Sequence, residues 1–147
     1  MYAPKITPTL DTAAYAIGDV LFAPTEVKLV TPQNGGACCL IGFQVIDESD
    51  QSPAFDIFIM DDNVPLGTVN GVPNIADALA SGDILGGPFS IPSTGWSDLG
   101  GVRSIKFNID PHIMNCKVGF TSVYITAVVQ SALTFAADSI KIRPMFM

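Results

Sequence analysis

Few residues in this 147-residue chain are suited to catalytic chemistry, and the single histidine is the first of them. General acid–base catalysis most often uses His, and here it must be His112, which follows Pro111 near an expected turn. No serine occupies a GxSxG turn that would complete a Ser-His-Asp set. Cys116 is four residues from His112, so both side chains would leave one strand in the same direction, without the opposed geometry of a Cys-His pair. We therefore expect a structural His112 and no enzyme activity.

The three cysteines do not form a recognisable site. Cys38 and Cys39 are adjacent, so on a strand they point to opposite faces and do not bridge each other. Either of them pairs with Cys116 only if the fold brings the two together. The chain has no CxxC spacing, and its one histidine is distant from two of the three cysteines, which argues against a zinc site. We expect reduced, buried cysteines and no cofactor or metal.

Two turns are rich in carboxylates: Asp47-Glu48-Ser49-Asp50 and Asp61-Asp62-Asn63. Carboxylate oxygens suit a hard cation, but neither turn has the alternating acids and central glycine of an EF-type calcium loop. Asp, Asn and Ser are also common in turns, because their side chains bond to the local backbone. Calcium therefore remains only an alternative here, as does sugar stacking on Trp96, which lies in an expected loop.

Hydrophobic residues recur with a period of two, which predicts strands that position these groups. About eight or nine strands separated by turn-rich segments are typical of a sandwich or barrel. Only one short helix is predicted, beginning at Asn74 and ending at Gly82. We predict an all-β, antiparallel chain with an N-terminal arm at residues 1–12 and a single domain at residues 13–147. The expected strands are Cys38–Ile46, Phe55–Met60, Val123–Val129, Ile140–Arg143, Asp19–Phe22, Glu26–Val30, Pro88–Ile91, Val102–Phe107 and His112–Val118.

Charge is low and unevenly distributed along the chain. Charged residues make up 14% of the sequence and the net charge is −7, so we expect no nucleic-acid partner. We also expect no membrane span or secretory signal, because no apolar run approaches ~18–20 residues and no charged segment precedes an apolar one near the N-terminus. Between Lys28 and Arg103 there are nine acids and no base, whereas from Arg103 onward there are five bases and two acids. This polarity predicts an acidic surface for a basic partner or pairing between subunits, and a merely solvated acidic face stays open.

Several phrases, in order along the chain, resemble a known family. They are Ala14–Leu21, Ile46–Gln51 with Asp56–Ile59, Ser81–Ile91 with Asp98–Gly101, Val123–Val128 and Thr134–Arg143. Together they are similar to the head decoration, or capsid cement, proteins of tailed bacteriophages. The resemblance implies a jelly-roll-like β-sandwich that forms a homotrimer on the outer surface of the virion after synthesis in the host cytoplasm. It also implies that the major capsid protein is the partner and that the chain clamps neighbouring capsid subunits.

Under this interpretation, the acidic turns are the predicted docking residues and the arm with the apolar C-terminus supplies the trimer contacts. The docking set is Asp47, Glu48, Asp50, Asp61 and Asp62. The trimer set is Tyr2, Ile6, Met114, Met145, Phe146 and Met147. Two other functions remain as alternatives: a tail- or fibre-associated virion protein, and a carbohydrate-binding module that uses Trp96 and calcium held by the acidic turns.

Overall fold

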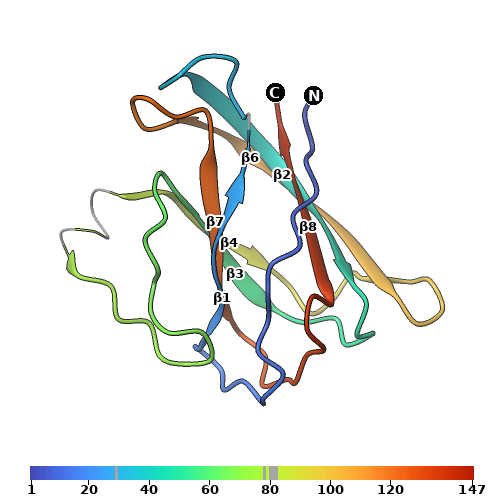
Figure 1. The fold of residues 1–147 in the computed structure, drawn as a ribbon. Coiled ribbons are helices and arrows are strands. Elements are labelled where there is room, and N and C mark those ends of the chain that lie inside the picture. The colour runs from blue at the N-terminus through green and yellow to red at the C-terminus, as the bar shows by residue number, and fades with distance from the viewer. Residues whose placement is uncertain (29, 78, 80–82) are drawn as a thin grey trace.

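A computed structural model describes residues 1–28, 30–77, 79 and 83–147, and these form two antiparallel sheets of four strands each (Figure 1). One sheet has the order β1-β7-β3-β4, and the other has the order β5-β6-β2-β8. Eight strands in two sheets match the strand number of a jelly roll, and successive strands change sheet at five of the seven connections. The predicted β-sandwich is therefore confirmed. The strands are β1 (Val20–Val27), β2 (Ala37–Asp47), β3 (Phe55–Met60), β4 (Ile84–Ile91), β5 (Ser97–Asp98), β6 (Arg103–Asn115), β7 (Val123–Val129) and β8 (Ile140–Phe146).

The core lies between the sheets and follows the alternation read from the sequence. On β3, Phe55, Ile57 and Ile59 are fully buried, while the residues between them are partly exposed. On the facing sheet, Phe43 and Val45 of β2 are fully buried in the same cluster. Successive side chains of a strand point to opposite faces. The core therefore needs apolar residues only at the alternate positions of each strand that face the other sheet.

Two pairs of predicted short strands are single strands in the structure. Asp19–Phe22 and Glu26–Val30 merge into β1, whose pairing with β7 shifts register twice. Val102–Phe107 and His112–Val118 merge into β6 across a bulge: Leu40 pairs with His112, whereas Gly42 pairs with Asn108. Pro111 lies in this bulge, where a residue without an N–H does not interrupt the ladder. The expectation that His112 lies beside a turn is therefore wrong: the residue lies inside the strand β6.

A long connection between β3 and β4 covers the outer face of the first sheet. Leu66 is buried there with Val20 and Met60, and Val64 and Ile75 pack against them. The predicted helix from Asn74 to Gly82 includes residues 78 and 80–82, which lie outside the described residues. No helix in the described ranges has the length and apolar character needed to cross a bilayer.

The N-terminal arm completes the second sheet of its own chain. Tyr2 pairs with Phe146 and Ile6 with Ile142, through backbone hydrogen bonds of 2.8–3.1 Å. Ile6 and Leu10 are buried, so the arm alternates like a strand along the edge of β8 (Figure 1). The apolar side chains Ile6 and Leu10 of this arm are therefore covered within the chain.

Candidate functional site

His112 on β6 joins its sheet to β4, the edge strand of the other sheet. Its Nε2 donates a hydrogen bond to the carbonyl oxygen of Leu85, at 2.9 Å, and its ring contacts that of Phe89 edge-on, with centroids 5.7 Å apart. Cys116 has different neighbours, among them the hydroxyl of Thr31 at 3.9 Å. These contacts give His112 a role in closing the sandwich.

Cys38 and Cys116 are buried close together as free thiols. Cys38 lies on β2 opposite Met114, and the N–H of Cys116 donates to the carbonyl of Gly36 at 3.0 Å, which places the two thiols diagonally on the inner face. Burial, with a smaller effect of the neighbouring thiols, raises the pKa of Cys38 to about 12. Cys39 points to the opposite face and is partly exposed. The expectation that all three cysteines are buried is therefore wrong for Cys39. The buried thiols stay protonated and poorly nucleophilic at neutral pH.

Asp47 is a structural residue, not a docking residue. Its side chain is fully buried, and its carboxylate accepts backbone N–H bonds from Ser49, Gln51 and Ser52 at 2.8, 2.6 and 2.9 Å. These bonds hold the turn that follows β2, as an Asp at a turn often does. The prediction that Asp47 contacts a capsid is therefore wrong, because a residue with no exposed surface cannot reach a partner.

The other four predicted docking residues lie in two separate groups. Glu48 and Asp50 are at the end of β2, where they pair with Lys141 at 3.4 Å and with Arg103 at 2.6 Å. Asp62 pairs with Lys117, which follows the end of β6 beside the first residue of β2. Because β2 has eleven residues, the two groups are separated by roughly 35 Å at about 3.3 Å per residue. They do not form one docking surface.

Asp61 lies beside a second carboxylate. Its pKa is raised, first by burial and then by the adjacent carboxyl of Asp83, while Lys117 opposes the shift. Oδ1 of Asp61 is buried without a hydrogen-bond partner in the described structure. The described residues hold no cluster of His, Cys, Asp or Glu with the arrangement of a metal site.

Most of the predicted trimer residues are inside the monomer. Four of the six are buried: Ile6, Met114, Met145 and Phe146. The side chain of Phe146 is only 1% exposed. The prediction is wrong for these four, because their side chains are covered within the chain, and Ile6, Met114 and Phe146 belong to the core cluster. Tyr2 and Met147 are exposed, and their trimer contact stays a prediction.

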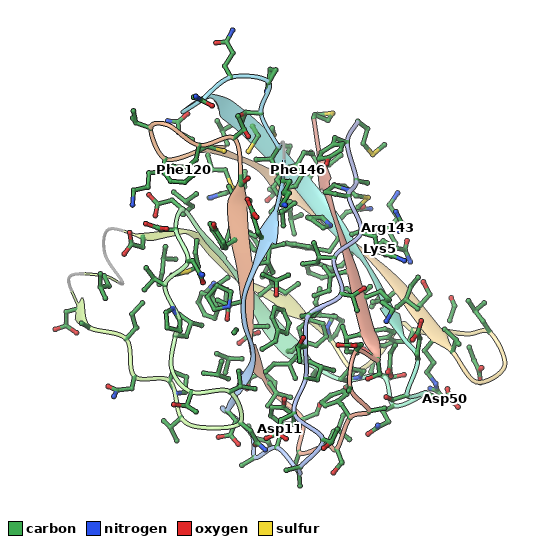
Figure 2. The ribbon with its side chains drawn as sticks, in the orientation of Figure 1. Lys5, Asp11, Asp50, Phe120, Arg143 and Phe146 are labelled. Carbon is green, nitrogen blue, oxygen red and sulfur yellow. The ribbon has the colours of Figure 1, made fainter. Side chains whose placement is uncertain are left out.

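The exposed apolar residues that do occur gather at the end of the sandwich where the termini lie, together with the 116–122 loop (Figures 1 and 2). This end contains six of the ten large apolar side chains found exposed among the described residues. The pairing of Cys39 with Ile113 and with Met147, and the bond from Gly35 to Phe120, bring their segments to this end. Sequence reasoning missed the Val118-Gly119-Phe120 turn, although an apolar pair around a turn glycine was a usable signal. We call this set the apolar end: Met1, Tyr2, Ile113, Val118, Phe120 and Met147.

A row of cations crosses the outer face of the second sheet. Gln44 on β2 pairs with Lys106 on β6 and with Arg143 on β8. The arm continues the row, because its two bridges share one register that places Lys5 opposite Arg143. Lys5, Arg143 and Lys106 are exposed, and Figure 2 shows the first two side by side. We call Lys5, Arg143, Gln44 and Lys106 the cationic row. Sequence reasoning missed it, because its members come from four separate segments.

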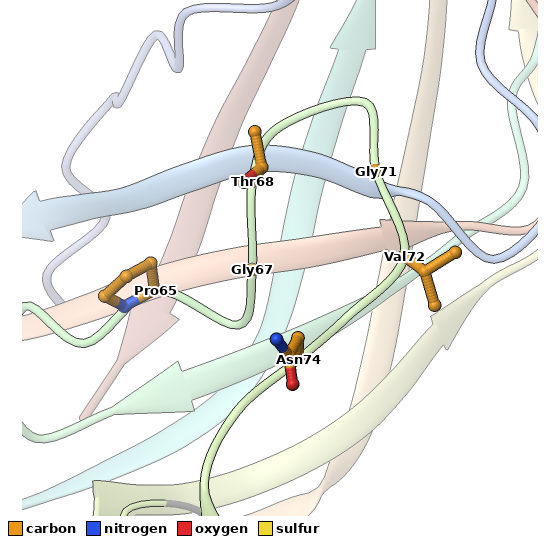
Figure 3. Close-up of a pocket in the computed structure, with 6 residues that line it drawn as sticks. All are labelled: Pro65, Gly67, Thr68, Gly71, Val72 and Asn74. Carbon is orange, nitrogen blue, oxygen red and sulfur yellow. The ribbon is translucent and has the colours of Figure 1, made fainter.

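The remaining candidates offer little for a ligand to bind. The indole N–H of Trp96 donates to the carbonyl of Pro92 at 2.7 Å, and the ring packs against the core, so it is not a free platform for a sugar. A shallow pocket in the loop between β3 and β4 is lined by small side chains and backbone (Figure 3). None of its six lining residues is titratable: Pro65, Gly67, Thr68, Gly71, Val72 and Asn74.

Comparisons with protein-family models, with curated proteins and with solved structures found no match to this chain.

Proposed function

We propose that this chain is a structural protein of a virus particle, which decorates the outer surface of a bacteriophage head and clamps neighbouring subunits of the major capsid protein. The phrases that resemble phage decoration proteins supply the specific identity. What the geometry adds is a β-sandwich with two exposed surfaces, the apolar end and the outer face of the β5-β6-β2-β8 sheet. Surfaces of this kind suit a protein that acts by binding other proteins.

One observation supports the proposal most directly: the two sheets differ in what covers them. The chain buries the outer face of its first sheet under the connection between β3 and β4. On the second sheet, Ile41, Gln44 and Ile46 of the central strand β2 remain partly exposed. A small sandwich that covers one face and leaves the other open is suited to docking on a larger assembly.

The proposed trimer would use the apolar end, since these side chains have no partner layer in the described part of the chain. Burying apolar area of this kind stabilises association by about 25 cal/mol per Å² before the entropy of association is subtracted. The trimer and the shell contact would then use different surfaces of the same molecule.

Cosedimentation with phage heads tests the proposal. Heads purified from a virus that lacks the gene for this chain are mixed with the purified protein, and bound protein is counted per head. We expect saturable binding that raises the temperature at which the heads release DNA. Failure to bind heads, or binding to tails alone, would contradict the proposal; the second result would favour the tail-associated alternative.

A further inference from the structure

The outer face of the second sheet has an unusual charge composition for this chain. Lys106, Arg143 and Lys5 are three of the seven bases of a molecule that has fourteen acids. The other four bases each have a carboxylate within 4 Å: Lys28 with Glu26, Arg103 with Asp50, Lys117 with Asp62 and Lys141 with Glu48. Within the described residues, no carboxylate lies within that distance of the three cations of the row.

The row is arranged as a single feature and not as scattered surface charges. It crosses three strand spacings, which is about 14 Å at 4.7–4.9 Å per spacing. Arg143 lies directly opposite Lys5, an arrangement of like charges that destabilises a sheet by itself. Among the described residues, its guanidinium donates one hydrogen bond, to the carbonyl of Ala3 at 3.3 Å. An external anion would therefore relieve repulsion as well as form new ion pairs.

Apolar side chains accompany the cations on the same face. Ile41 and Ile46 point outward from β2 on either side of Gln44, and both are partly exposed. A surface that mixes exposed aliphatic groups with cations and an amide resembles the core and rim of a protein interface. Nucleic acid is a poorer fit, because three cations would displace few counterions and a net charge of −7 repels a long polyanion.

We propose that the cationic row is a docking site for a carboxylate-rich surface of a partner protein, whose acidic side chains pair with Lys106, Arg143 and Lys5 while its apolar groups cover Ile41 and Ile46. The charge argument stands without the proposed function. Only the identification of the partner as the capsid shell rests on that function, and in that case the shell contact is cationic on this chain instead of acidic.

Binding to fluorescently labelled poly-L-glutamate, followed by anisotropy at low salt, tests the row without a known partner. The test variant is Lys106→Gln with Arg143→Gln. The matched control is Lys28→Gln with Lys117→Gln, which changes the net charge equally but removes exposed bases that already have a carboxylate. We expect the row variant to bind about tenfold more weakly, the control to stay within about twofold of the original chain, and binding to weaken as salt rises. Circular dichroism and a melting curve confirm that both variants fold.

Three results would overturn the proposal: no binding of poly-L-glutamate by the original chain, equal weakening in both variants, or tighter row-dependent binding of duplex DNA than of poly-L-glutamate. The head-binding experiment separates this inference from the proposed function. If the original chain does not bind poly-L-glutamate, the row is refuted whatever the heads do. Row-dependent binding of poly-L-glutamate with no binding to heads refutes the function and leaves the row in place.

Discussion

At the scale of single residues, Asp47 shows why an acidic turn is not evidence of a docking site. Its side chain is buried, and its two oxygens satisfy three backbone N–H groups, those of Ser49 and Gln51 at part-buried bonds and that of Ser52 at a buried one. Asp47→Ala would leave those three donors without this acceptor, the buried N–H of Ser52 among them, and each lost bond to a charged group costs about 1.5–3 kcal/mol. We expect the free energy of unfolding to fall by at least about 2 kcal/mol in urea titrations. The neighbouring Glu48→Gln is the control, because it breaks only a partly exposed pair and should cost under about 1 kcal/mol.

Asp61 provides a prediction about pH. Its pKa is raised above 3.8, so the folded chain binds this proton more tightly than the unfolded chain does. Above the raised pKa, the ionised group beside Asp83 therefore destabilises the fold, and this cost disappears as the pH falls toward 3.8. We expect Asp61→Asn to raise the urea midpoint at pH 7 and to leave it unchanged near pH 3.5. A gain that persisted at low pH, or that Asp56→Asn reproduced, would contradict this explanation.

At the scale of elements, the arm protects an edge strand. Without residues 1–10, β8 would present its unpaired backbone to solvent and the core would lose the cover of Ile6 and Leu10. Ile6→Ala should lower the free energy of unfolding by about 2–4 kcal/mol. The neighbouring Thr7→Ala, on the exposed side of the arm, should change it by less than about 0.5 kcal/mol. Chemical denaturation of the two variants checks the alternation, and similar losses in both would contradict it.

The elements also show what the sequence allows and what it hides. Periodicity located both ends of β3 and of β7 to the residue, because their inward apolar sets are unbroken. It divided β6 in two, because the bulge at Asn108–Pro111 reads as a turn when the partner strand is unknown. Sequence separation also concealed the cationic row. Lys5, Gln44, Lys106 and Arg143 become neighbours only through strand register, which no local pattern specifies.

At the scale of the whole molecule, the acidic middle and the basic end of the sequence do not become one acidic and one basic surface. The acids that the sequence predicts to form one acidic surface do not form one. Asp47 holds a turn from a buried position, whereas Asp50 and Asp62 form ion pairs at opposite ends of the sandwich. Two cations of the C-terminal half, Lys106 and Arg143, and Lys5 of the arm have no carboxylate partner in the described structure, and all three lie on one sheet face. The apolar end forms a further surface at the termini. A protein with separate apolar and cationic surfaces can associate with itself through one and dock through the other.

Because the apolar end is separate from the cationic row, self-association can be tested without any partner. The double variant Val118→Asp with Phe120→Asp places two charges in the apolar end, where Val118 is 90% exposed in the single chain. Because burying an unpaired charge in an interface is strongly unfavourable, the proposed trimer should become a monomer in size-exclusion chromatography with light scattering.

Ile17→Asp with Val72→Asp is the matched control, since both residues are exposed apolar side chains outside the apolar end. The control should stay trimeric, and its binding to poly-L-glutamate should match that of the original chain. A monomeric original chain at micromolar concentration, or a control that dissociates as readily as the test variant, would remove the apolar end as the trimer contact.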